Sequence, residues 1–295
     1  MRCAILVAAI ALFVAWLMHA GLSLHSYPDR LAQISSADTV IDNTGPYATK
    51  ADWSPTGKMA MLHKVTPVRA EFFDAELVRL REQSESSSKP LRVLDAGCGG
   101  GLISNSLARR GHNITGIDIS VGALDYARDT ARAEGLENAR FEMGSLYELP
   151  YASHSFDAVV CSDVLEHITD LKSVLRELRR VLRPGGLLLV DTINRTWLSL
   201  LVAVFGAEVV LGACVPGSHD WRLFITPEEL TEAMEASGFR VRRNFPGFRP
   251  SLTMVLDALR AYVFHAIPVE DIRGEVSLEA SPGWVNYFAV AETGS

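Results

Sequence analysis

Val93-Leu-Asp-Ala-Gly-Cys-Gly-Gly-Gly101 is an apolar run that leads into an acidic residue and then into glycines at positions 97, 99 and 101. This order predicts a strand, a glycine loop and a helix over residues 102–110. We expect glycine in the loop because a cofactor can then lie against bare backbone, and because positive φ is often required there. The amide-rich N-terminus of the helix would point at whatever binds in the loop.

A second apolar strand is predicted over residues 113–119 and ends near Asp118, about twenty residues after the first glycine. This spacing places a carboxylate at the far side of the crevice, within reach of a ribose diol. A glycine loop alone is weak evidence, and a tight turn in any α/β protein is the alternative. The spacing G-x-G-x-G, with Asp95 just before it, differs from the dinucleotide pattern G-x-G-x-x-G.

Length and charge restrict the possible functions. The 295 residues are enough for one large domain with additions. The 28 basic and 35 acidic residues give a net charge of −7, so a nucleic-acid partner is not expected. The four cysteines, Cys3, Cys98, Cys161 and Cys214, include no C-x-x-C pair. They predict buried free thiols, with neither a zinc site nor a disulfide framework.

The N-terminal part of the chain divides into two segments. Residues 1–25 are nearly all apolar and long enough to cross a bilayer as a helix. A retained membrane anchor and a cleaved targeting segment are the two interpretations, whereas a mitochondrial presequence would be amphipathic and rich in arginine. Residues 26–88 are predicted to form a linker and an N-terminal helical cap. Its helix is expected over residues 67–83, with Pro67 near the first helical position.

Strands and helices alternate within residues 89–295. This alternation predicts an α/β fold with a Rossmann-like, doubly wound, mostly parallel sheet of seven strands. Besides the two strands above, strands are expected over residues 139–143, 155–161 and 187–191, with a turn over residues 183–186. Helices are expected over residues 121–134 and 171–182. Residues 155–161 form a continuous apolar run, which indicates a strand buried on both faces.

An apolar insertion, residues 195–225, interrupts the alternation. Its longest apolar part is short for a membrane span, so a buried helix and a lid that contacts lipid are the alternatives. Thr226-Pro-Glu-Glu229 then predicts a capped helix that ends near residue 237, with Gly238 as its C-terminal cap. Residues 240–244 and 284–292 are expected to form a terminal antiparallel hairpin.

Two carboxylates and an imidazole lie within five residues after the predicted strand 155–161. If Asp163 opens a helical turn, Glu166 and His167 lie on the same face as Asp163. Two oxygens and one nitrogen suit a divalent ion such as Mg²⁺, with Zn²⁺ or Mn²⁺ as alternatives. The alternative is that an acid in this loop only caps the next helix.

Asp95-Ala-Gly-Cys-Gly-Gly-Gly101 resembles motif I of the class I S-adenosylmethionine-dependent methyltransferases. The resemblance implies that the loop passes the methionine part of S-adenosylmethionine and that Asp118 holds its ribose. Many members have an acid where this chain has Ser145, so backbone amides near Ser145 are expected to meet the adenine. The cofactor residues that the resemblance implies are Arg69, Asp95, Gly97, Gly99, Gly101, Asp118, Ser145 and Ser162.

Further stretches are similar to the ubiquinone-biosynthesis O-methyltransferases, which act on polyprenylated catechols. These are Leu62-His-Lys-Val-Thr-Pro-Val-Arg69, Leu165-Glu-His167, Thr192-Ile-Asn-Arg195, Gly206-Ala-Glu208 and Val215-Pro-Gly-Ser-His-Asp-Trp221. The similarity implies that Arg69 meets the cofactor carboxylate and Ser162 lines the adenine side. It also places a metal triad on Asp163, Glu166 and His167, where Asp163 replaces the family's Glu.

This resemblance implies O-methylation of a lipophilic polyprenyl catechol, with His167 as ligand or base and His219 as a second candidate base. It further implies a membrane surface and other quinone-biosynthesis enzymes as partners. The expected location is membrane-associated: the mitochondrial inner membrane in a eukaryote, otherwise a single-pass or peripheral membrane protein, with a secretory signal as the alternative. The competing functions are a methyltransferase for another lipophilic phenol, a sterol or a small metabolite, and a non-enzymatic scaffold.

Overall fold

The computed structural model describes residues 49–83, 89–201, 203–204, 219–251, 253–254, 256–257, 260, 271–280 and 285–294. Across these ranges, no helix combines the length and the apolar character needed to cross a membrane. The predicted anchor at residues 1–25, the linker up to residue 48 and residues 205–218 of the insertion lie outside the described residues.

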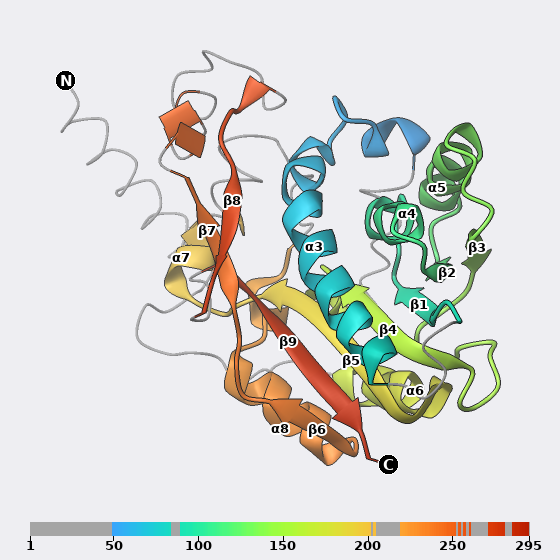
Figure 1. Ribbon diagram of the computed structural model, residues 1–295. Helices are drawn as coiled ribbons and strands as arrows, with labels where there is room; N and C mark the ends of the chain where they lie inside the picture. Colours follow the sequence, from blue (N-terminus) through green and yellow to red (C-terminus); the bar gives the residue numbers. More distant parts are fainter. Residues whose placement is uncertain are drawn as a thin grey trace.

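A seven-stranded sheet forms the centre of the molecule, as predicted, in the order β3-β2-β1-β4-β5-β9-β6 (Figure 1). The first five of these pair in parallel, and β9 runs antiparallel to both β5 and β6. The strands are β1 (Arg92–Ala96), β2 (Asn113–Asp118), β3 (Ala139–Met143), β4 (Phe156–Ser162), β5 (Leu182–Ile193), β6 (Phe239–Arg242) and β9 (Asn286–Thr293).

Helices cover both faces of this sheet, which confirms the doubly wound prediction (Figure 1). On one face, buried side chains of α3 and α4 pack against β1, β4 and β5. On the other, buried side chains of α6 and α8 pack against the same strands. The main helices are α3 (Ala60–Glu82), α4 (Leu102–Arg109), α5 (Val121–Ala133), α6 (Leu171–Val181) and α8 (Pro227–Ala236).

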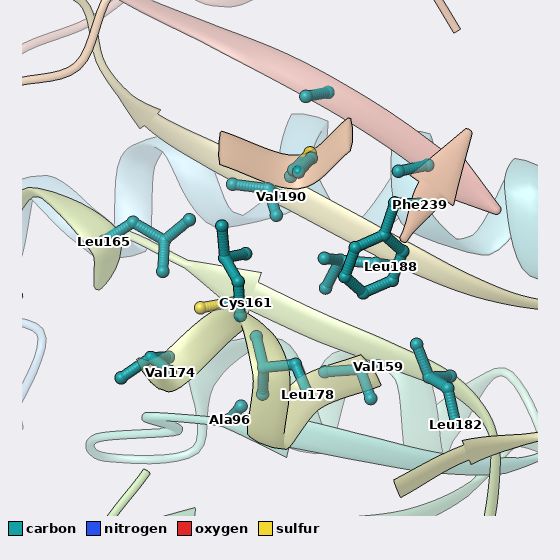
Figure 2. Packing of buried hydrophobic residues seen from close by; sticks show 14 of the residues in the cluster. Ala96, Val159, Cys161, Leu165, Val174, Leu178, Leu182, Leu188, Val190 and Phe239 are labelled. Atoms are coloured by element: carbon teal, nitrogen blue, oxygen red, sulfur yellow. The ribbon is translucent and has the colours of Figure 1, made fainter. Parts of the chain in front are cut away.

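Figure 2 shows the apolar layer beneath β4 and β5, where Cys161, Val190 and Leu178 lie close together. All three side chains are fully buried. Cys161 and Cys98 are free, buried thiols, as predicted, whereas Cys3 and Cys214 lie outside the described residues. The layer anchors β4 and β5, whose C-terminal ends carry the candidate site.

The predicted start of the first helix was wrong. α3 begins at Ala60 and contains Pro67 in its interior, although proline removes one helical hydrogen bond. The early turns are stabilised by packing, because Met61 and Val65 contact a buried cluster around Met254. Tertiary contacts therefore extend the helix beyond the point at which the proline signal placed its start.

Two predictions near the C-terminal half also need correction. Residues 183–186 form no separate turn but a bulge within β5, where the register passes from Phe156 opposite Leu182 to Ala158 opposite Leu187. The last two sheet strands, β6 and β9, are antiparallel neighbours but not a simple hairpin. In the sequence, the chain between β6 and β9 forms a separate two-stranded sheet of β7 (Gly247–Pro250) and β8 (Val276–Glu279).

Candidate active site

The glycine loop lies between the end of β1 and the start of α4. Gly97, Gly99 and Gly101 have φ of 79°, 50° and 72°, in the left-handed region that favours glycine. The amides of Gly97 and Cys98 donate to the carbonyl of Ile117 at 2.8 and 3.0 Å, which ties the loop to β2. The predicted loop and its requirement for positive φ are confirmed.

Side chains of the protein itself fill the space beside these glycines. A Cβ atom on Gly97 would lie 2.5 Å from Cγ2 of Val164, and a Cβ atom on Gly99 would collide with the indole ring of Trp53. We expected the Cβ positions to be empty for a cofactor, but they make room for packed side chains. Of the loop glycines, Gly97 is partly exposed, whereas Gly99, Gly100 and Gly101 are buried.

Asp118 lies at the carboxyl end of β2, beside the loop. Its Oδ2 accepts a hydrogen bond from the amide of Gly99 at 2.8 Å, and its Oδ1 accepts one from the amide of Ser120 at 2.8 Å. Asp95 is buried and accepts a hydrogen bond from the Ser104 hydroxyl at 2.6 Å. Burial is the main cause that raises the pKa of Asp95 to about 6. Asp118 is therefore fixed beside the glycine loop, and Asp95 supports the loop from within the fold.

The two residues predicted on the adenine side, Ser145 and Ser162, lie at the ends of β3 and β4, which β2 and β1 separate in the sheet. Ser145 follows β3, where its hydroxyl accepts a hydrogen bond from the amide of Tyr147 at 3.2 Å, and Ser162 ends β4. Sequence reasoning missed two apolar side chains here: Ile119 is 49% exposed and Met143 is 64% exposed. Met143 is in register with Asp118, the residue before Ile119. An apolar residue directly after the acidic strand end was the available signal, and such a surface suits a planar ring.

Arg69, on α3, is buried between two acidic side chains from different parts of the sheet. Its Nη2 lies 2.5 Å from Oδ2 of Asp163, and its Nε lies 2.9 Å from Oδ2 of Asp191. Its guanidinium carbon is 5.4 Å from the ring centroid of Phe248. Burial raises the pKa of Asp191, although the charge of Arg69 opposes this effect. The predicted cofactor ligand Arg69 thus already balances two carboxylates of the protein.

The prediction that Asp163 opens a helical turn was wrong. Asp163 has φ of 51°, and the short helix η2 (Leu165–His167) begins only after it. Its backbone amide donates to the carbonyl of Asp191 at 3.1 Å, and its carboxylate pairs with Arg69. The left-handed residue breaks the periodicity that would have placed Asp163 on the same face as the side chains of η2.

The predicted metal triad is not supported by the part of the chain that the structure describes, where no three or more His, Cys, Asp or Glu side chains are arranged to hold a metal ion. Glu166 is fully buried, and Thr192 Oγ1 donates to its Oε2 at 2.8 Å. Burial, followed by the charge of Asp163, raises the pKa of Glu166 and favours the neutral acid. With Asp163 paired to Arg69, this donor set does not fit a divalent ion.

The two predicted candidate bases lie together, although they are far apart in the sequence. The ring centroids of His167, on η2, and His219, from the end of the apolar insertion, are 5.4 Å apart. Burial and, less strongly, the charge of His219 hold the pKa of His167 well below its ordinary value. His167 is therefore a neutral imidazole at neutral pH, which can accept a hydrogen bond but is a weaker base than an ordinary histidine.

Aromatic side chains from the two ends of the insertion pack together, and one of them lies next to His219. Trp197 and Trp221 stack with ring centroids 5.1 Å apart, and the Trp221 indole donates to the Thr196 carbonyl at 3.1 Å. The ring of Phe224 lies 6.1 Å from that of His219. Trp221 and Phe224 are buried in one cluster with Leu200 and Val204, so the described ends of the insertion pack into an aromatic core next to His219.

Comparison with known proteins places this site in context. Residues 94–190 match the family model described as a methyltransferase domain. A ubiquinone biosynthesis O-methyltransferase of Azorhizobium caulinodans is 37% identical over 243 residues, which cover 81% of this chain and 87% of that protein. One from Methylocella silvestris is 40% identical over 193 residues, covering 63% of this chain and 75% of that protein.

Solved structures agree on the fold. The YcgJ protein of Bacillus subtilis has a TM-score of 0.50 and 18% identity, covering 70% of this chain and 93% of its own. A protein solved in work on the conversion of a disulfide bond into a thioacetal group during echinomycin biosynthesis has a TM-score of 0.52 and 23% identity, covering 74% and 81%. At such identities the likeness concerns the fold alone.

Proposed function

Because the chain belongs to the family of ubiquinone biosynthesis O-methyltransferases, we propose that it methylates a hydroxyl of a polyprenylated catechol, with S-adenosylmethionine as the methyl donor. Family and fold make it an S-adenosylmethionine-dependent O-methyltransferase acting in ubiquinone biosynthesis. The observation that carries the finer proposal is the 37% identity over 87% of the A. caulinodans enzyme. The two imidazoles that lie together, His167 and His219, agree with a phenolic acceptor that has to lose a proton.

The residues around the glycine loop fit S-adenosylmethionine. Asp118 is held by two backbone amides at the edge of the crevice, where its carboxylate can accept hydrogen bonds from ribose hydroxyls. Ile119 and Met143 offer an exposed apolar surface next to it for the adenine ring. When bound, S-adenosylmethionine supplies a sulfonium methyl group that an oxygen nucleophile takes by in-line displacement, leaving S-adenosylhomocysteine.

The acceptor hydroxyl has to lose its proton, since a phenol titrates near 10, as tyrosine does. His219 is the stronger candidate to receive it at a ring nitrogen, because burial lowers the pKa of the neighbouring His167 and makes it the weaker base. Trp197, which is half-buried and stacks on the buried Trp221, can contact the aromatic ring of the acceptor. Positioning and proton removal are thus the contributions of this chain's own residues.

The predicted Mg²⁺, Zn²⁺ or Mn²⁺ has no step in this scheme, because Asp163 is engaged by Arg69 and Glu166 is buried with Thr192. A metal would need Asp163 to leave that ion pair. Excess chelator is therefore expected to leave turnover unchanged. Loss of turnover with chelator, and its return with Mg²⁺, would contradict this view.

We also propose that the enzyme works at a membrane, in line with a polyprenylated substrate and the apolar segment over residues 1–25. A membrane surface and other enzymes of quinone biosynthesis are its proposed partners. In a eukaryote the location would be the mitochondrial inner membrane. Sedimentation of the full chain with phospholipid vesicles, compared with a chain that begins at residue 26, tests the membrane contact.

The deciding experiment is methyl transfer from S-adenosylmethionine to a short-chain prenyl catechol by the full chain in mild detergent. The wild type should turn over, and His219→Ala should lose about a hundredfold in kcat while retaining affinity for S-adenosylhomocysteine. Asp118→Ala should instead raise the KM for S-adenosylmethionine. Tight cofactor binding with turnover only on a sterol or an unprenylated phenol would overturn the proposed substrate.

A further inference from the structure

The segment before α3, residues 49–59, contacts the glycine loop from outside the sheet; we call it the Trp53 cap. The short helix η1 (Lys50–Trp53) lies within it. The Trp53 side chain is buried, and it packs with Met59 and with Ala123 of α5. A Cβ atom on Gly100 would lie 2.5 Å from Cε3 and 2.6 Å from Cδ2 of this indole. The indole ring therefore covers the backbone of the loop.

Independent contacts hold the cap in this position. Asp52 accepts hydrogen bonds from the Thr49 amide and hydroxyl, and Lys58 Nζ lies 2.9 Å from its Oδ1. The amide of Met59 donates to the Asp52 carbonyl at 2.9 Å. Lys50 forms an ion pair with Asp129, which lies on α5. Contacts within the Trp53 cap and an ion pair to α5, the helix that follows Asp118, thus hold the cap in place.

The indole and Asp118 contact the same short piece of backbone. Gly99 donates its amide to Oδ2 of Asp118 at 2.8 Å, and the indole of Trp53 fills the space beside its α-carbon. Loss of the indole would open space beside Gly99, whose amide is one of the two that orient the Asp118 carboxylate. A site held by packed neighbours binds its ligand in a preorganised form.

We propose that Trp53 is a positioning residue of the cofactor site, which holds the glycine loop and Asp118 in the geometry that binds S-adenosylmethionine. Residue 100 is then glycine in order to admit the indole, and not in order to admit the cofactor. The inference rests on the proposed function only in that the ligand of the loop is S-adenosylmethionine.

Gly100 allows a clean test because its φ lies outside the left-handed region, so alanine there meets no backbone strain. Gly99 lacks this advantage, since its φ is 50°. We would measure the affinity for S-adenosylhomocysteine by calorimetry in wild type, Gly100→Ala, Trp53→Ala and the double variant. No acceptor is needed, so the result does not depend on the substrate.

Each single variant should weaken binding about tenfold, since small misplacements of a site have effects of this size or larger. The double variant should bind no worse than Trp53→Ala, because the alanine methyl then has space. Trp53→Phe should restore most of the affinity. At saturating S-adenosylmethionine, Trp53→Ala should turn over with the kcat of the wild type. The substitution should therefore raise only the KM for S-adenosylmethionine.

Two results would overturn the inference. If Gly100→Ala weakens binding equally with and without Trp53, residue 100 faces the cofactor directly. If Trp53→Ala binds as well as the wild type, the cap has no positioning role. If Trp53→Ala fails to fold, Gly57→Ala is the second variant. Its Cβ atom would lie 2.5 Å from the Asp52 carbonyl oxygen and displace the Trp53 cap. Unchanged affinity of Gly57→Ala for S-adenosylhomocysteine would also contradict the inference. A wild type that binds no S-adenosylhomocysteine would instead overturn the proposed function.

Discussion

Arg69 is a buried cation whose charge is matched by acids at the ends of two neighbouring strands. Asp163 follows β4 and Asp191 lies in β5, and both carboxylates approach its guanidinium. Removing one partner of a buried ion pair leaves the others without compensation, which costs far more than loss of a surface pair. This cluster therefore joins α3 to the C-terminal ends of β4 and β5.

Arg69→Met should lower the free energy of unfolding by about 3–5 kcal/mol, because the buried carboxylate of Asp191 and the partly buried one of Asp163 lose their cation. Denaturation in urea measures the change. The matched control is Arg92→Met, whose exposed side chain pairs with Asp157 at 3.7 Å, and which should cost less than about 1 kcal/mol. Adding Asp191→Asn to Arg69→Met should recover part of the loss, and a further loss would contradict the account.

Asp95 predicts a dependence of stability on pH. Burial raises its folded-state pKa from 3.8 to about 6. A carboxyl with a raised pKa stabilises the folded state fully below its ordinary pKa, and this contribution is lost as pH rises through the raised value. As the pH rises from 3.8 to about 6, the free energy of unfolding should therefore fall less in Asp95→Asn than in the wild type. Thermal unfolding across this range measures it, and the exposed Asp125→Asn should keep the wild-type slope.

At the scale of elements, α8 begins with a capping box that also reaches the apolar insertion. Thr226 accepts from the Glu229 amide at 3.3 Å, and Glu229 Oε2 accepts from the Thr226 amide at 3.0 Å. The other oxygen of Glu229 pairs with Arg195, a buried residue at the start of the insertion. One side chain thus starts a helix and neutralises a buried cation.

Glu229→Ala should destabilise the protein by about 3–5 kcal/mol, because it removes both the cap and the charge partner of Arg195. Glu228 is the matched control, since it is exposed in the same first turn of α8. Glu228→Ala should stay within about 0.5 kcal/mol of wild type. Chemical denaturation compares the two; equal effects would show that the Arg195 pair adds nothing.

At the scale of the whole molecule, ligand binding and folding are linked. A ligand that binds only the folded chain adds about 2.7 kcal/mol at a hundredfold excess over its Kd. S-adenosylhomocysteine should therefore raise the Tm of the wild type by several degrees in a thermal-shift measurement. Asp118→Asn should reduce this shift, while Asp125→Asn, on α5 and away from the loop, should keep it. If S-adenosylhomocysteine raises the Tm of Asp118→Asn as much as that of the wild type, Asp118 does not bind the ribose.

Much of the architecture follows from local signals in the sequence. The alternation of apolar strands and helices predicted the seven-stranded sheet, because each signal depends on residues close together in the chain. The glycines at positions 97, 99 and 101 predicted positive φ, and Thr226 predicted the start of α8. Positive φ and helix capping each depend on a few neighbouring residues. The resemblance to a family of methyltransferases rested on the same short motifs and is confirmed.

Long-range packing determined the rest. Nothing within a few residues of Arg69 indicates that its charge is balanced by Asp163 and Asp191, because those acids come from strands far along the chain. The contact of Trp53 with Gly100 likewise joins distant segments. Local sequence determines which φ angles, caps and apolar faces are possible, since these depend on neighbouring residues. Which side chains meet, and so which carboxylate is paired, is decided only when the elements pack.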